Sequence, residues 1–119
     1  MSVAVSPMNS VVLVGDRESG EVPEAMGFGV VAATGSCLAV GARAAVDGET
    51  TVRVAGRGEG ELGGLSRAWA GVLATPSGVL VVSDVVGTEL LALSVEPVVS
   101  VEVWVNDPRE PDLIHVVVR

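Results

Sequence analysis

Valine occupies 27 of the 119 positions of this chain, and it recurs at every second residue in short bursts. The clearest burst covers residues 101–105 (VEVWV), where three valines alternate with Glu102 and Trp104. Side chains alternate between the two faces of a strand, so this spacing gives a strand one apolar face. β-branched residues also fit strands better than helices. The chain is therefore predicted to be all-β.

The valine bursts are cut by Gly, Pro, Asp and Asn, and they define about nine short strands with little or no helix. The segment 65–75 (LSRAWAGVLAT) also suits a helical turn, but its alternating apolar residues favour a strand. Asp47-Gly48 is the strongest hairpin signal, and it predicts one long hairpin over residues 36–55. The segments with strand patterning are 3–6, 10–14, 27–33, 36–46, 50–55, 65–75, 78–83, 88–95, 98–105 and 113–119.

Composition narrows the architecture to two thin layers. Only 3% of the residues are aromatic, so Val, Leu and Ala must supply the core volume, and they fill two closely packed sheets better than a wide barrel. At this length one domain covering residues 1–119 is expected. The prediction is a single antiparallel β-sandwich with a jelly-roll-like arrangement. One face of the expected hairpin would carry Leu38, Val40, Ala42, Ala44 and Val46.

The charge balance points away from nucleic acid and towards protein. The chain has seven basic residues, all of them Arg, and fifteen acidic ones, so its net charge is −8. Phosphate neutralisation supplies most nucleic-acid affinity, so direct binding to nucleic acid or to anionic lipid is disfavoured. An acidic surface suits solubility or docking on a basic protein. We find no signal-peptide pattern and no membrane-spanning run, so a cytoplasmic location is predicted.

The residues that usually carry chemistry are nearly absent. His115 is the only histidine, and on the last strand it is expected to be exposed or at an interface. Cys37 is the only cysteine, so no internal disulfide can form, and it is expected to be a buried, inert thiol. The Gly-rich segment 56–64 lacks the Lys-Ser or Lys-Thr of a phosphate loop. No catalytic residue, metal site or cofactor is predicted, and the protein is expected not to be an enzyme.

Candidate partner-binding residues come from one aromatic side chain and from the acidic loops. If the valines of 101–105 face inwards, Trp104 stands outwards beside a carboxylate, as interface anchors often do. Whether Trp69 also faces outwards, on the same face as Arg67, is left open by the sequence in the same way. Acidic loops at 16–24, 59–61 and 107–112 would steer a basic partner. The predicted partner-binding residues are Trp104, Glu102, Glu59, Glu61, Asp107 and Glu110.

The order of features along the chain carries a resemblance. An opening pair (VAVSPMNSVVLVGD), an acidic loop with VPE and the segment GFGVVAA precede Asp47-Gly48; SRAW, SGVLVVSDV, VSVEVWVND and DLIHVVV follow it. This pattern resembles a family of small bacterial β-sandwich proteins related to the competence protein ComJ. The resemblance spans most of the chain as strands and turns, and it implies a jelly roll. The family's namesake inhibits a DNA-entry nuclease, and no residue-level motif transfers a binding residue.

Two functions are therefore expected from the sequence. The first is a non-enzymatic protein-interaction module, an inhibitor or immunity protein that masks a basic toxin or nuclease surface. The alternative is a phage or capsid decoration subunit, or another self-assembling structural protein. It rests on valines that occupy both faces of their strands, at 79–82 and 116–118.

Overall fold

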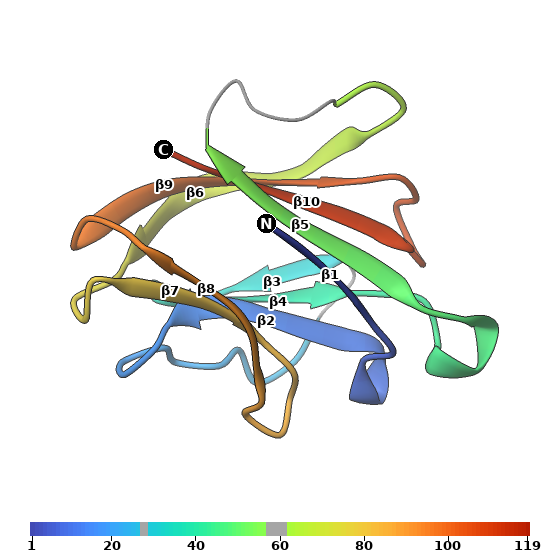
Figure 1. The fold of residues 1–119 in the computed structure, drawn as a ribbon, viewed down its shortest axis with the longest axis horizontal. Coiled ribbons are helices and arrows are strands. Elements are labelled where there is room, and N and C mark those ends of the chain that lie inside the picture. Colours follow the sequence, from blue (N-terminus) through green and yellow to red (C-terminus); the bar gives the residue numbers. More distant parts are fainter. Residues whose placement is uncertain (27–28, 57–61) are drawn as a thin grey trace.

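The computed structural model describes residues 1–26, 29–56 and 62–119, which form two stacked five-stranded sheets (Figure 1). The first sheet has the order β1 (Ser2–Val5), β5 (Thr50–Gly56), β10 (Leu113–Val118), β9 (Val98–Val105) and β6 (Ser66–Ala74). The second has the order β3 (Val31–Ala33), β4 (Cys37–Gly41), β2 (Val11–Asp16), β7 (Val79–Ser83) and β8 (Glu89–Ser94). Two short 3₁₀ turns, Met8–Ser10 and Ala45–Asp47, are the helical elements of the described residues.

The predicted all-β sandwich is confirmed, with one departure from antiparallel pairing. β10 pairs with β5 in parallel, Leu113 opposite Thr51, and with β9 in the antiparallel sense. The predicted strand at 27–33 is shorter than expected: β3 covers Val31–Ala33, and residues 27–28 lie outside the described part of the chain. No helix among the described residues is long and apolar enough to span a membrane.

The predicted hairpin over residues 36–55 is wrong, because β4 and β5 belong to different sheets. After β4 the backbone N–H of Arg43 donates to the carbonyl of Pro111, in the β9–β10 connection of the first sheet, at 3.0 Å. The 3₁₀ turn and Gly48, with φ +122°, then lead into β5. Alternation marks each strand but carries no information on which sheet the strand joins, so the Asp47-Gly48 turn signal predicts local pairing where there is none. Val46, expected on the same face of the hairpin as Leu38 and Val40, is 93% exposed in this turn.

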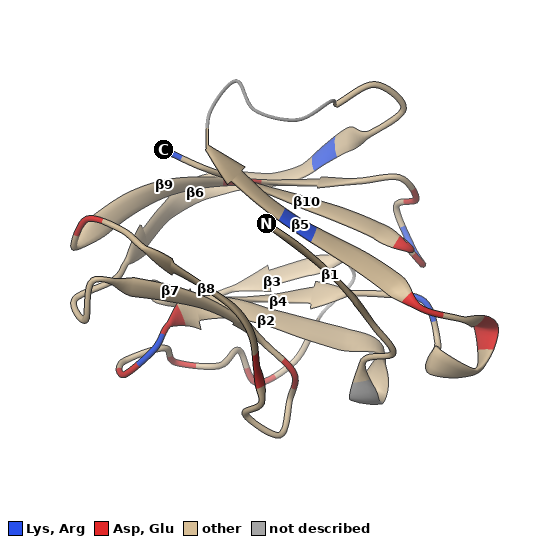
Figure 2. Ribbon diagram, viewed as in Figure 1, with Lys and Arg blue, Asp and Glu red and all other residues tan. Residues whose placement is uncertain are grey.

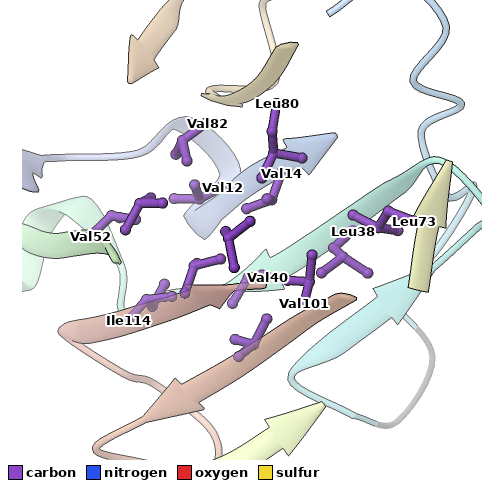
Figure 3. Packing of buried hydrophobic residues seen from close by; sticks show 14 of the residues in the cluster. Val12, Val14, Leu38, Val40, Val52, Leu73, Leu80, Val82, Val101 and Ile114 are labelled. Atoms are coloured by element: carbon purple, nitrogen blue, oxygen red, sulfur yellow. The ribbon is translucent and has the colours of Figure 1, made fainter. Parts of the chain in front are cut away.

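The core lies between the sheets and is built mainly from valine (Figure 3). On β9 the odd-numbered valines point inwards, and Val101 and Val103 are almost fully buried. Leu38, Leu73 and Ile114 are the largest apolar side chains that are fully buried. Both sheets contribute one alternating face, as the spacing of the valine bursts predicts.

β6 is a strand, as predicted, but a bulge changes which residues face the core. The register against β9 shifts between Arg67 and Trp69. Beyond this bulge Leu73 is fully buried, whereas Val72 is 57% exposed. Trp69 packs against the core cluster, and a Cβ at Gly71 would lie 2.7 Å from its ring. Of the alternating Ala and Val residues that indicate a strand, Ala70, Val72 and Ala74 therefore form its outer face, whereas Ala68 at the bulge packs against the core.

The second apolar faces of several strands are also buried within the described chain. Leu13, Cys37 and Ala39 on the outer face of the second sheet form a small cluster to which Met26 of the β2–β3 connection packs. On the outer face of the first sheet Val117 is only 5% exposed. Much of the apolar surface on the second faces of these strands is thus buried within the chain itself, and less of it is left for a partner than the sequence suggests.

We expect L38A to destabilise the protein by about 3 kcal/mol, because it opens a cavity between the sheets. Leu38 is fully buried in the inter-sheet cluster. V46A is the matched control, since Val46 is 93% exposed, and it should change stability by less than about 0.5 kcal/mol. Urea unfolding followed by circular dichroism measures both. Equal losses for the two variants would contradict this assignment of the core.

Candidate partner-binding site

Acidic residues lie mostly in the connections at the ends of the sandwich and rarely on the strands (Figure 2). Of the predicted partner-binding residues, Glu59 and Glu61 lie outside the described residues. The other four fall into two groups in different places. Glu102 and Trp104 lie on β9, whereas Asp107 and Glu110 lie in the connection that follows it.

Glu102 and Trp104 form a hydrogen-bonded pair on the outer face of the first sheet. The Trp104 Nε1–H donates to a Glu102 carboxylate oxygen at 3.2 Å, and the indole is half-buried. The other carboxylate oxygen accepts from Arg119 at 2.6 Å and lies 3.5 Å from an Arg67 nitrogen. The bond from Trp104, followed by the charges of both arginines, lowers the pKa of Glu102 below its usual range. Glu102 is thus an ionised carboxylate whose charge is already balanced within the chain.

His115 is buried rather than exposed, which corrects the sequence-based expectation. It is 1% exposed, and its register neighbours on the outer face are Arg53 of β5 and Trp104 of β9. The reason is the place of β10 in the middle of the first sheet, where large side chains on both neighbouring strands surround the imidazole. The expectation for His115 rests on local sequence alone, and sequence order does not reveal that β10 is central.

Asp107 and Glu110 line an acidic hollow at one end of the sandwich. This hollow has a volume of about 380 Å³, and two connections far apart in sequence form it. The sequence gives no sign that residues of the β4–β5 connection belong here, because the predicted hairpin keeps that connection away from residues 106–112. The residues that line it are Arg43, Asp47, Asn106, Asp107, Glu110 and Asp112.

Local hydrogen bonds hold the hollow's rim. The Asn106 side-chain oxygen accepts from the backbone N–H groups of Asp112, at 3.2 Å, and Leu113, at 3.1 Å. Its amide nitrogen donates to the Asp112 carboxylate. Arg43 joins the two connections, because it donates twice to the Glu49 carbonyl and lies 3.6 Å from an Asp112 oxygen. The acidic side chains are therefore presented by a braced loop.

The hollow has negative charge available for a partner. Backbone N–H groups of Glu110 and Arg109 donate to the Asp107 carboxylate and lower its pKa, so it is ionised at neutral pH. Within the described part of the chain, the carboxylates of Asp47 and Glu110 make no hydrogen bond or ion pair. Among the described residues no group of three or more His, Cys, Asp or Glu is arranged to hold a metal ion. This geometry suits a cationic side chain of another molecule.

Asp16, in the first of the predicted steering loops, has a structural place instead. It is 4% exposed, and its carboxylate accepts from the backbone of Glu18, Ser19 and Ser77 and from the Ser77 hydroxyl at 2.6 Å. Burial alone would raise the pKa of Asp16, but these hydrogen bonds outweigh it, and the pKa is lowered. Asp16 thus ties the β2–β3 connection to the β6–β7 turn and is not available to a partner.

The geometry defines a two-sheet β-sandwich with an acidic hollow at one end. No family model matches the sequence, and no curated protein matches it. A solved structure does match in fold: the crystal structure of ComJ from Bacillus subtilis, described as an inhibitor of the DNA degrading activity of NucA. The TM-score is 0.69 at 10% sequence identity, and the match covers 98% of this chain and 94% of that chain. The resemblance expected from the order of strands and turns is confirmed as a shared fold.

We expect D16N to destabilise the protein by about 2–3 kcal/mol at neutral pH, because an amide NH₂ replaces an acceptor that N–H groups surround. The folded-state pKa of Asp16 lies below the ordinary value of 3.8. Its contribution is therefore full above about pH 4 and is lost as the pH falls through the folded-state pKa. Unfolding midpoints of wild type and D16N should converge below about pH 4. E18Q is the control, since Glu18 is exposed. If the difference between the unfolding midpoints of wild type and D16N stays the same at low pH, the stabilising role of the ionised Asp16 is contradicted.

The Cys37 thiol should react with a maleimide only when the chain unfolds. Cys37 is 3% exposed, and burial raises the pKa of its thiol to about 11. Thiolate is the reactive form, so at pH 7 the native protein offers very little of it. Mass spectrometry of labelling with and without urea measures this. Rapid labelling of the native protein would show that the outer face of β4 opens readily.

Proposed function

We propose that this protein is a non-enzymatic interaction module of the inhibitor type, which masks the basic surface of a nucleic-acid-degrading protein. The observation that carries the proposal is the acidic hollow between the β4–β5 and β9–β10 connections. Its carboxylates come from a braced loop, and two of them have no partner within the described chain. A surface that binds nucleic acid is rich in Lys and Arg, so it offers the complementary charge.

The electrostatics of the whole chain favour the same kind of partner. The net charge of −8 attracts a basic surface over a distance of about one Debye length. The hollow is the proposed place where that surface binds. Such steering raises association rates more than it raises affinity. Asp107 and Glu110 would contact the partner's cations directly. Glu59 and Glu61 remain proposed contributors, and Trp104 remains a proposed anchor at the end of β9.

The shared fold makes an inhibitor the favoured kind of interaction module. ComJ is an inhibitor of the DNA degrading activity of NucA, and this chain has its fold over nearly the whole length of both proteins. We therefore extend inhibition of a nuclease to this chain as part of the proposal. The alternative of a decoration or assembly subunit has less support than the sequence suggested, since Val81 and Val117 are buried within the chain.

The test compares two variants that lose the same charge. D47N/D107N/E110Q removes three carboxylates from the hollow, and each replacement keeps an acceptor oxygen. E18Q/E21Q/E24Q removes three exposed carboxylates from the β2–β3 connection. Tagged protein is used to capture partners from native lysate at low and high salt. We expect wild type and the E18Q/E21Q/E24Q control to retain a basic protein that the hollow variant loses, with weaker capture at high salt.

Capture alone does not decide the proposal. The recovered partner is purified and assayed for DNA degradation with added wild type, hollow variant or control. Wild type and control should inhibit, and the hollow variant should require at least roughly tenfold more protein, equivalent to about 1.4 kcal/mol. A partner retained and inhibited equally by the hollow variant, or a captured partner without nuclease activity, would overturn the proposal.

A further inference from the structure

The edge of β6 carries an unusual stretch of open backbone. β6 is nine residues long and, among the described strands, pairs only with β9. The Ala74 N–H donates to the Gly35 carbonyl at 2.8 Å and so points away from β9. Backbone groups alternate in direction along a strand, so the N–H and C=O groups of Ala70 and Val72 also point to the free edge. Within the described residues neither has a backbone partner on that side.

The open stretch is short because both of its ends are closed. At one end the bulge between Arg67 and Trp69 twists the strand out of register. At the other end the Gly35 carbonyl occupies the edge at Ala74. Only the backbone between these points offers a regular template for another strand. Such ends keep any added pairing short.

The side chains of this stretch itself are uncharged, and the carboxylate beside it, Glu102 opposite Ala70 on β9, is balanced by Arg67 and Arg119. Residues 68–74 (AWAGVLA) contain no charged residue. Val72 is 57% exposed, and Val98, opposite Ala74 on the neighbouring strand, is 62% exposed. Natural edge strands usually carry a charge or a proline that prevents pairing with another chain. The β6 edge has neither between its bulge and Ala74.

Charge indicates which partner fits here. A basic protein gains nothing from a strip without carboxylates, and it has the acidic hollow at another place. Two copies of this chain, each with a net charge of −8, repel one another wherever acids face acids. They approach with the least repulsion along the β6 edge, because residues 68–74 carry no charge and the nearby Glu102 carboxylate is balanced by Arg67 and Arg119. A second copy is therefore the occupant that the charge distribution favours.

We infer that two copies pair through their β6 edges, antiparallel about an axis at Gly71. Ala70 of each copy then stands opposite Val72 of the other, and each pair exchanges both backbone hydrogen bonds. Val72 packs beside Ala70 on the outer face, and the two first sheets become one continuous sheet. The contact is the same on both copies, so it closes as a dimer and does not propagate. The pairing is independent of the proposed inhibitor function.

Two variants of the full chain test the pairing by sedimentation velocity over micromolar to millimolar concentrations. V72P removes the N–H that points away from β9, so the ladder to β9 stays intact while the pairing loses its donor. A70K/V72K places like charges opposite one another across the axis. We expect wild type to sediment as a concentration-dependent dimer. Both variants should raise the dissociation constant roughly tenfold or more.

V46K/V86K is the matched control for charge, because Val46 and Val86 are exposed valines in turns, at 93% and 63%. It should dimerise as wild type does. Circular dichroism melts establish whether each variant is folded. If V72P does not fold, A70K/V72K alone tests the pairing. Wild type that remains a monomer at millimolar concentration would overturn the inference. Equal dimer dissociation constants for A70K/V72K and V46K/V86K would also overturn the inference.

Discussion

The close packing of two valine faces is the interaction on which the rest of this structure depends. Valine is short, so the sheets can approach only if almost every inward position along β2, β9 and β10 is apolar and regularly spaced. That requirement keeps acids off the inward faces and moves most of them to the connections. The charged ends of the molecule are thus a consequence of the thin core. The acidic hollow exists because two such connections meet at one end.

Alternation in the sequence predicts the strands well, because burial on one face of a pleated strand is a local property. β9 matches its predicted bounds, Val98–Val105, and the inward direction of its valines was correct. On β6 the same rule predicts the strand but not its faces, because a single bulged residue moves Leu73 inwards and Val72 outwards. A bulge leaves no mark in a pattern of small apolar residues such as AWAGVLA. The face of a strand therefore needs three-dimensional information even where its extent does not.

Long-range arrangement was the part of the site that sequence reasoning could not reach. Asp107 and Glu110 were proposed from their loop, but Asp47 joins them only because β4 and β5 belong to different sheets. Glu102 looked like a free acid beside Trp104, yet Arg67 and Arg119 come to it from a neighbouring strand and from the residue after β10. Both outcomes depend on strand order, which periodicity does not encode.

The central place of β10 has a consequence for how the chain folds. β10 is the last strand in sequence order, yet it is flanked by β5 and β9 and separates them. During synthesis the first sheet consequently cannot close until residues 113–118 have left the ribosome, and until then β5 and β9 have unsatisfied edges. The parallel contact between β5 and β10 joins segments about sixty residues apart, which slows closure through the cost of a large loop. Nascent chains therefore depend on β10 to cover the unpaired edges of β5 and β9, which could otherwise pair with other chains.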